Sequence, residues 1–318
     1  MITTLGDTGL EVTRIGLGLA ALGRPGYINL GHAEDLLGHT DVESMERRAH
    51  EVLDAAYEGG VRYFDAARSY GLAEAFLASW LAERGFGPDD VTVGSKWGYT
   101  YTANWRVDAE VNEVKDLSEA TLERQLTESQ ELLGNHLRLY QIHSATLDSG
   151  VLDDPAVMEE LAQLRANGMR IGFTTSGARQ AETIERALEV GGFDAVQSTW
   201  NLLERSAGSA LETAHHEGLG VIIKEALANG RLTERGEVPE LAEAARITGR
   251  APDALALSAV LARPWVDVVL SGATTVPELE SNLVARSLEP GGDALELLDA
   301  IGEAPDTYWQ KRSELPWN

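Results

Sequence analysis

Four ionisable side chains stand at or near the ends of three consecutive strand-like segments. Asp65 ends the second such segment of the chain, and Tyr70 lies just beyond it. Lys96 follows the third segment, and His143 ends the fourth. Where neighbouring strands run parallel in a barrel, their carboxyl ends meet at one face, so these groups could lie close together. A phenol, an ammonium, a carboxylate and an imidazole in one place suit proton transfer to a carbonyl oxygen.

The phenol of Tyr70 is the proton donor in this interpretation. Its unperturbed pKa of about 10 makes it a weak acid near neutrality. The ammonium of Lys96 would stabilise the phenolate and lower the pKa, while Asp65 would hold that ammonium in place and keep it charged. A neutral His143 could orient the substrate carbonyl. Each residue alone could be structural, but their joint placement on three consecutive strand ends favours catalysis.

These side chains need elements that position them, and the chain alternates short apolar segments with longer amphipathic ones. The predicted strands are Arg14–Gly18, Arg62–Asp65, Val91–Ser95, Leu139–His143, Arg170–Thr174, Ala195–Ser198, Val221–Lys224 and Val266–Leu270. The predicted helices are Ser44–Glu58, Leu72–Arg84, Glu119–Leu133, Ala156–Asn167, Ala178–Val190, Gly208–Glu217, Pro239–Thr248, Ala254–Ala262 and Val276–Arg286. This alternation predicts a parallel sheet with crossover helices, and eight units favour a closed (β/α)8 TIM barrel over a doubly wound sheet.

Three further segments lie outside the eight units. A turn at Gly6–Gly9 predicts an N-terminal β-hairpin, and the tail Pro290–Asn318 could cover the barrel mouth or pack on its outside. The irregular stretch Trp97–Lys115 carries four aromatic residues, which could line a substrate pocket or pack on one another. No linker-like composition divides the chain, so we expect residues 1–318 to form a single barrel domain.

Composition excludes several classes of function. The 26 basic and 51 acidic side chains give a formal net charge of −25, which argues against nucleic acids and anionic membranes as partners. The absence of cysteine excludes disulfides, thiolate metal sites and cysteine nucleophiles, and no other metal-ligand cluster stands out. The N-terminus lacks the features of a signal peptide, and no apolar run approaches the ~18 residues of a membrane span. We therefore expect a cytoplasmic protein that acts on a small molecule without a metal.

One motif has the residue spacing of a dinucleotide-binding fingerprint but not its structural context. Gly16-x-Gly18-x-x-Ala21 has the glycine spacing of a Rossmann fold. In that fold the motif opens a helix, whereas here Gly23-Arg24-Pro25-Gly26 follows, and no helix is expected before Ser44. We reject the Rossmann interpretation.

The segment Phe64–Gly71 resembles the D-T-A-x-x-Y-G signature of the aldo-keto reductases. Lys96 and His143 stand where that family has its lysine and histidine. The resemblance covers nearly the whole chain, from the N-terminal hairpin to Asn282, and implies that Asp65, Tyr70, Lys96 and His143 form a catalytic tetrad. It also implies an NAD(P)H-dependent oxidoreductase that reduces an aldehyde or ketone to an alcohol, or runs the reverse reaction.

On the cofactor side the resemblance implies a second set of residues. Gln197 resembles the glutamine that binds the nicotinamide carboxamide, and Thr174 and Thr175 take the place of the family's Ser-Asn pair. Asn282 matches the adenine-binding asparagine, and Lys224 falls where a stacking aromatic residue or an arginine is common. The residues implied at the pyrophosphate and the adenosine phosphate are Glu225, Ala226, Leu227, Gly272, Ala273, Thr274 and Glu278.

The adenosine segment departs from the family pattern. Members that prefer NADPH usually place lysine or arginine there to pair with the 2′-phosphate, whereas this chain has uncharged residues at 272–275 and the carboxylate of Glu278. A carboxylate repels a phosphate, which predicts a weakened preference for NADPH and makes NADH an alternative. NADPH remains the family's default, because another loop could supply a cation.

Two rival functions remain open at this point. Some proteins of this resemblance are nicotinamide-binding regulatory subunits without significant turnover, although an intact tetrad speaks against a purely regulatory role. A barrel isomerase or aldolase could instead form a Schiff base at Lys96 or Lys224. The sequence leaves open the substrate, the preferred reaction direction and the oligomeric state.

Overall fold

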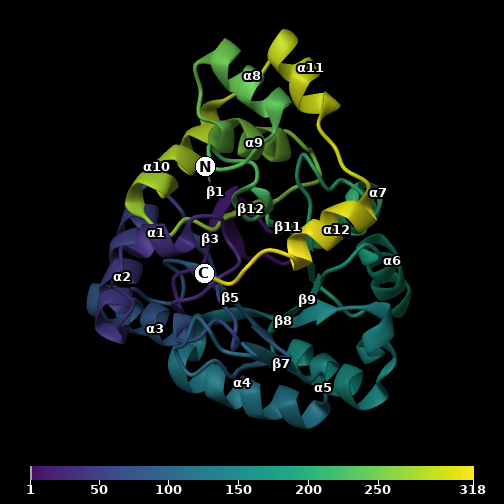
Figure 1. The fold of residues 1–318 in the computed structure, drawn as a ribbon. Coiled ribbons are helices and arrows are strands. Elements are labelled where there is room, and N and C mark those ends of the chain that lie inside the picture. The colour runs from purple at the N-terminus through teal and green to yellow at the C-terminus, as the bar shows by residue number, and fades with distance from the viewer. Residues whose placement is uncertain (1) are drawn as a thin grey trace.

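A closed barrel of eight parallel strands forms the centre of the molecule, as the computed structural model of residues 2–318 shows (Figure 1). The barrel strands are β3 Ile15–Gly18, β4 Tyr63–Asp65, β5 Thr92–Trp97, β8 Leu137–Ala145, β9 Arg170–Thr175, β10 Ala195–Thr199, β11 Gly220–Lys224 and β12 Val268–Ser271. Each pairs with its neighbours in chain order, and β12 pairs with β3 to close the ring. The predicted (β/α)8 TIM barrel is confirmed.

Helices surround this barrel. They are α1 His32–Leu36, α2 Val42–Glu58, α3 Ala73–Arg84, α4 Glu119–Leu133, α5 Pro155–Ala166, α6 Gln180–Val190, α7 Gly208–His216, α8 Pro239–Thr248, α9 Pro252–Leu261, α10 Val276–Val284, α11 Asp293–Ala300 and α12 Pro305–Ser313. The expectation that no helix precedes Ser44 was wrong. Helix α1 has five residues, too few for a hydrophobic period to show in the sequence, and α2 already begins at Val42 because Asp41 caps it.

Two small antiparallel hairpins accompany the barrel. Strands β1 Ile2–Thr4 and β2 Glu11–Thr13 form the predicted N-terminal hairpin, and its Leu5, Leu10 and Val12 pack against inward-facing barrel residues. This hairpin closes the end of the barrel where the strands begin, so a site has room only at their carboxyl ends. The second hairpin, β6 Tyr99–Tyr101 with β7 Glu113–Lys115, lies within the loop that follows β5.

The C-terminal tail both packs on the outside of the barrel and covers its mouth, the two arrangements considered from the sequence. Helix α11 packs beside α8 on the outside of the barrel, whereas α12 and the last residues cross its mouth (Figure 1). The terminal residue Asn318 exchanges two backbone hydrogen bonds of 3.1 Å with Tyr27, in the loop after β3. Across residues 2–318, no helix combines the length and the apolar character that a membrane crossing requires.

Candidate active site

Asp65 and Lys96 form a buried ion pair at the carboxyl ends of β4 and β5. The Lys96 ammonium donates to a carboxylate oxygen of Asp65 and, at 3.0 Å, to the Ala66 carbonyl oxygen. Both side chains are almost fully excluded from solvent. The Nζ atom of Lys96 lies 4.9 Å from the centroid of the Tyr70 ring. The carboxylate, the ammonium and the phenol predicted from the sequence are therefore in contact.

His143, at the end of β8, completes this cluster. Its ring meets the Tyr70 ring edge to face at a centroid distance of 5.6 Å, and its Nδ1 lies 3.4 Å from the Ser69 hydroxyl. Burial lowers the pKa of His143 well below its usual value, and the Lys96 cation lowers it further. The imidazole is therefore neutral near pH 7, as expected for a group that hydrogen-bonds a substrate carbonyl.

Asp65 also receives hydrogen bonds from neutral donors inside the barrel. Its Oδ2 accepts from the Tyr63 hydroxyl at 3.0 Å, from the Gln197 amide at 2.9 Å and from the Gln141 amide at 3.4 Å. The sequence analysis missed Tyr63 and Gln141. A signal was present, because each stands two residues before a site residue on its strand and so faces the same side.

Burial raises the pKa of the Tyr70 phenol above its ordinary value, and the Asp65 carboxylate raises it further. The sequence predicted the opposite direction, from the ammonium of Lys96 alone. The difference arises because the argument from the sequence left out burial, which is the largest cause, and the carboxylate of Asp65. The guanidinium of Arg24, which the sequence analysis did not single out, is the cation that lowers this pKa.

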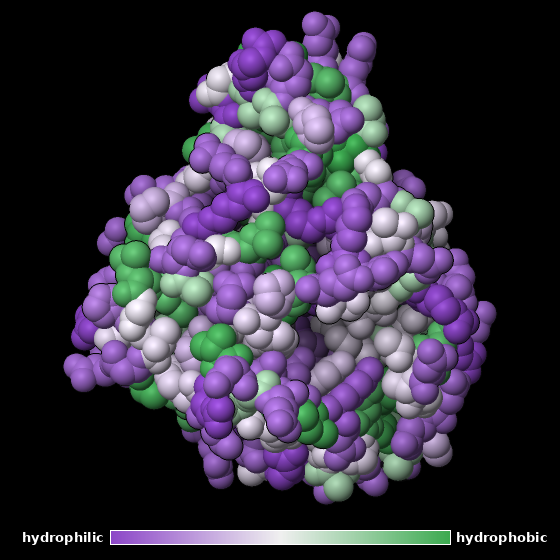
Figure 2. Space-filling model, in the orientation of Figure 1, coloured by the Kyte–Doolittle hydropathy of each residue, from purple (hydrophilic) through white to green (hydrophobic). Residues whose placement is uncertain are grey.

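A cavity of about 710 Å³ extends from the tetrad across the barrel mouth. Figure 2 shows its opening as a hollow near the middle of this face. Asp65, Tyr70 and His143 line one end of the cavity, and Asn282 lines the other, while Lys96 lies behind the lining. The predicted cofactor residues that line it are Gln197, Lys224, Glu225, Ala226, Leu227, Gly272, Ala273, Thr274, Glu278 and Asn282.

The structure does not place Thr174 and Thr175 on the cavity wall. The Thr174 hydroxyl accepts from the backbone N–H of Ser144 at 2.7 Å, and the Thr175 hydroxyl donates to Ser198 at 2.8 Å. Both threonines are fully buried, and the next residue, Ser176, lines the cavity instead. In this structure the two threonines hold neighbouring strands together.

A partly buried ion pair lines the cavity between its two ends. The Arg312 guanidinium of α12 places its Nε 2.9 Å from both carboxylate oxygens of Glu225, which follows β11 with a positive φ of 53°. Although burial opposes the shift, the Arg312 and Lys224 cations lower the pKa of Glu225 to about 2. Burial lowers the pKa of Lys224 to about 8, and its amine donates to the Thr199 hydroxyl at 3.0 Å. The tail thus contributes a charge to the site.

At the far end, the carboxylate of Glu278 caps helix α10. Its Oε2 accepts from the backbone N–H groups of Thr274 at 2.9 Å and Thr275 at 3.3 Å, and from the Thr274 hydroxyl at 3.0 Å. One turn further along, Asn282 donates to Asp253 at 2.7 Å. A carboxylate of the chain therefore already accepts from the backbone N–H groups that lead into α10, and its negative charge disfavours a second anion there.

Arg235, in the loop after β11, stands at the same end. Its Nη1 donates to Asp35 at 2.7 Å and to the Leu30 carbonyl oxygen at 2.9 Å, and it lies 3.5 Å from a Glu278 oxygen. The sequence left room for a cation from another loop, and Arg235 is such a cation. Two carboxylates, however, share its charge.

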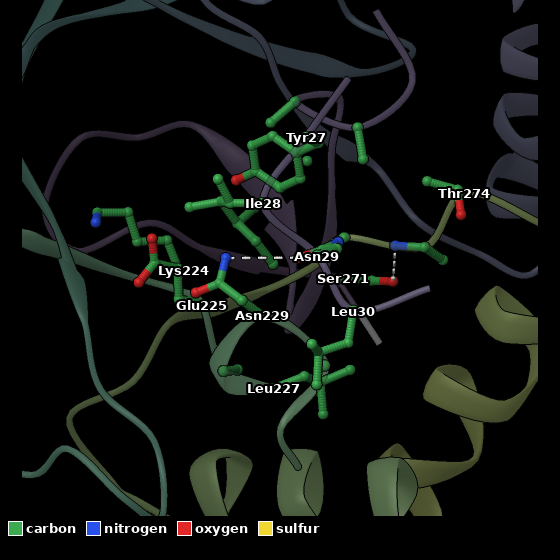
Figure 3. A pocket seen from close by; sticks show the side chains of 18 of the residues that line it. Tyr27, Ile28, Asn29, Leu30, Lys224, Glu225, Leu227, Asn229, Ser271 and Thr274 are labelled. Atoms are coloured by element: carbon green, nitrogen blue, oxygen red, sulfur yellow. Dashed lines mark hydrogen bonds between the residues drawn. The ribbon is translucent and has the colours of Figure 1, made fainter. Parts of the chain in front are cut away.

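The loop that follows β3 lies over the cavity from the other side. In Figure 3, Tyr27 and Ile28 of this loop face Glu225 and Asn229, which follow β11. The Leu30 N–H donates to the Asn229 carbonyl oxygen at 3.0 Å. The two loops therefore meet above the cavity and partly enclose it.

Comparison with known proteins identifies the family of this chain. A model of the aldo/keto reductase family matches residues 14–303. The uncharacterized oxidoreductase YrpG of Bacillus subtilis is 27% identical over 96% of this chain and 98% of its own length. D-threo-aldose 1-dehydrogenase of a Pseudomonas species is 26% identical, over 94% of each protein.

A solved structure supports the fold independently. The structure of an aldo-keto reductase from Bacillus halodurans, in its holo form, superposes with a TM-score of 0.72 at 22% identity. The match covers 96% of this chain and 99% of that one. At this level of identity the likeness supports the barrel architecture alone, and the activity must be inferred from the site residues of this chain.

Proposed function

Because this chain belongs to the aldo/keto reductase family, we propose that it is a nicotinamide-dependent enzyme that reduces an aldehyde or ketone to an alcohol, or runs the reverse. Tyr70 gives the proton in reduction and takes it in oxidation. The observation that carries this proposal is the cluster of Asp65, Tyr70 and His143 at one end of a cavity that continues to Asn282. Mutation of Tyr70 to phenylalanine tests it directly, because the variant should lose turnover and keep its affinity for the cofactor.

The chain's own groups supply the proton chemistry. The raised pKa keeps the Tyr70 phenol protonated near pH 7, ready to donate to a carbonyl oxygen that gains negative charge. Lys96 stabilises the phenolate that remains, and Asp65 keeps that ammonium in a site from which water is excluded. A neutral His143 donates a hydrogen bond to the same carbonyl oxygen without competing as an acid.

The cavity residues fit a nicotinamide dinucleotide, which when bound supplies or accepts the hydride. The Gln197 amide lies next to Asp65, where it can hold a carboxamide close to the tetrad. Lys224 offers a cation on the cavity wall, which suits an anionic dinucleotide. Asn282 lines the far end, where its amide nitrogen donates one hydrogen bond to Asp253 and keeps a second for a purine. The lining thus offers polar partners along its length.

For the cofactor, we propose that NADH binds at least as well as NADPH, although NADPH is the family's default. The Glu278 carboxylate accepts from the backbone N–H groups of Thr274 and Thr275 at this end of the cavity, and Arg235 is paired with Asp35. Both contacts disfavour the binding of the negatively charged 2′-phosphate that distinguishes NADPH from NADH. Fluorescence titration of the protein with each cofactor measures the two dissociation constants, and an NADPH affinity far above that for NADH would contradict the proposal.

The substrate end combines aromatic rings with charged groups. Tyr27, Tyr99 and Trp317 line it together with Arg24 and Glu113. Rings and paired hydrogen-bonding groups suit a ring-bearing, polar carbonyl compound or its alcohol. Since one similar protein is named an aldose dehydrogenase, the test panel should include cyclic aldoses beside aromatic aldehydes and ketones, each with NADH and NADPH. Tight cofactor binding without turnover on any compound would favour the regulatory alternative.

A further inference from the structure

A second ion pair, Arg24 with Glu113, lies against the proton donor. The Arg24 guanidinium carbon is 5.4 Å from the centroid of the Tyr70 ring. Its Nη1 donates to the carbonyl oxygen of Ser69 at 2.8 Å and to Glu113 at 3.0 Å. Arg24 comes from the loop after β3 and Glu113 from β7, so neither belongs to the strands that carry the tetrad.

Direct backbone contact fixes Arg24 against Tyr70. The Leu72 N–H donates to the Gly23 carbonyl oxygen at 2.7 Å. A Cβ atom on Gly23 would lie 2.2 Å from the Tyr70 carbonyl oxygen, and one on Gly71 would lie 2.4 Å from the Gly23 carbonyl oxygen. Only glycine fits at these two positions, and Gly71 also has a positive φ of 61°. The two segments are therefore held together without depending on the ion pair.

The surroundings make the charge of Arg24 effective. Its side chain is 3% exposed, and its guanidinium also lies 4.7 Å from the Trp317 ring centroid and 5.2 Å from that of Tyr27. The Nε atom is buried and has no hydrogen-bond partner among residues 2–318. A charge held among aromatic rings is screened less than one in water, so it acts strongly on its neighbours.

The charges that face Tyr70 come from several elements. Asp65 and Lys96 are paired with each other, and His143 is neutral. The other charges that act on the pKa of Tyr70 are those of Arg24 and Glu113, which are paired with each other, and that of Glu225, which is paired with Arg312. Burial and Asp65 have the largest effects on the pKa of Tyr70, and both raise it. Of the next two charges, the Arg24 cation lowers this pKa and the Glu113 carboxylate raises it.

We propose that Arg24 is a positioning residue for Tyr70: its guanidinium stabilises the phenolate, Glu113 opposes it, and the pair sets the pH range in which Tyr70 exchanges its proton. This inference rests on the proposed function, in which Tyr70 is the acid and base. It adds a second charge pair, supplied by loops, to the Asp65–Lys96 pair.

The proposal predicts opposite effects for the two partners. Loss of the Arg24 charge destabilises the phenolate, so the pKa of Tyr70 rises. Loss of the Glu113 charge removes a repulsion, so that pKa falls. In alcohol oxidation the phenolate is the base, and the rate increases with pH until Tyr70 is ionised. The alkaline rise should therefore move to higher pH in Arg24→Gln and to lower pH in Glu113→Gln.

The experiment is a pH profile of kcat/KM for alcohol oxidation in the wild-type enzyme and in these variants. We expect each shift to be about one pH unit, the size of a partly screened interaction at this separation. Arg24→Lys should return the profile toward that of the wild type, because it restores the charge. Glu243→Gln and Arg246→Gln make the same charge changes in an exposed pair on α8 and should leave the profile unmoved.

Shifts of opposite sign support the proposal, whereas unshifted profiles, or shifts in one direction for both variants, overturn it. If Arg24→Gln fails to fold, Glu113→Gln decides alone, because that side chain is 26% exposed and its amide can still accept from Arg24. Wild-type oxidation that Tyr70→Phe leaves intact would overturn both this inference and the proposed function. Tyr70-dependent oxidation with unmoved profiles would overturn this inference only.

Discussion

The two ends of the cavity are built from different kinds of structure. At the near end, Asp65, Lys96 and His143 project from barrel strands whose hydrogen-bonded register fixes their separation. At the far end, Asp35 of the short helix α1 meets Arg235 of the loop after β11, 200 residues away in the chain. Strands hold the near end in the fixed geometry that proton transfer needs. The residues of the far end can be exchanged to suit a different ligand without disturbing the barrel.

This contrast separates catalysis from recognition. The near end holds its charges in pairs inside the barrel, so a change there should alter turnover and spare binding. The far end holds its charges on one loop and on the helices α1 and α10, so a change there should alter which cofactor binds and spare the chemical step. Each prediction below tests whether the two ends can be changed independently.

The largest effect is expected for Tyr70→Phe. Loss of the phenol removes the proton donor, so kcat for carbonyl reduction should fall by about a thousandfold. Cofactor affinity, measured by fluorescence titration, should stay near the wild-type value. Tyr57→Phe is the matched control, because its ring packs on Trp80 and Phe86 and does not line the cavity. Full activity in Tyr70→Phe would refute the assignment of the proton donor.

The sequence was sufficient to predict the near end because its residues lie at the ends of periodic segments. Strand alternation places Asp65, Lys96 and His143 at the same end of adjacent strands, and the barrel follows from repeating that unit. The pKa direction of Tyr70 could not be predicted, because it depends on burial and on Arg24, a contact between loops. Nor could Thr174 and Thr175 be placed on or off the cavity wall, since their side chains bond to neighbouring strands.

Loss of the ion pair between Glu225 and Arg312, which lies between the two ends of the cavity, should lower the stability of the fold. The pKa of Glu225 is lowered to about 2, so its ion pair stabilises the fold fully above about pH 4.5 and loses that contribution as the pH falls toward 2. Glu225→Gln should lower the free energy of unfolding at pH 7 by on the order of 3 kcal/mol. The difference from wild type should narrow between pH 5 and pH 3 in urea titrations.

Glu243→Gln is the control for this measurement, because its pair with Arg246 is exposed and should change stability by less than about 0.5 kcal/mol. A difference between Glu225→Gln and wild type that does not vary with pH would show that the variant acts through packing and not through the lost charge.

At the far end, Asp35→Asn and Glu278→Gln should change cofactor preference. Each removes a negative charge near Arg235, so the NADPH dissociation constant should fall by about tenfold while that of NADH changes little. The kcat at saturating cofactor should not move. Glu280→Gln makes the same charge change on an exposed face of α10 and should leave both constants as they are. Equal gains for NADH and NADPH would mean that the carboxylates do not discriminate the 2′-phosphate.

The smallest effect is expected at Lys224, which lies between the two ends. Burial lowers its pKa to about 8, so the side chain loses its positive charge between pH 7 and pH 9. A cation that lines the cavity attracts an anionic dinucleotide, and the affinity should therefore weaken by about threefold over that range. Lys224→Arg stays charged and should bind with constant affinity, whereas Lys224→Met should bind weakly at both pH values. If the wild-type affinity were constant between pH 7 and pH 9, Lys224 would not contribute its charge to binding, and recognition would rest on the residues of the far end.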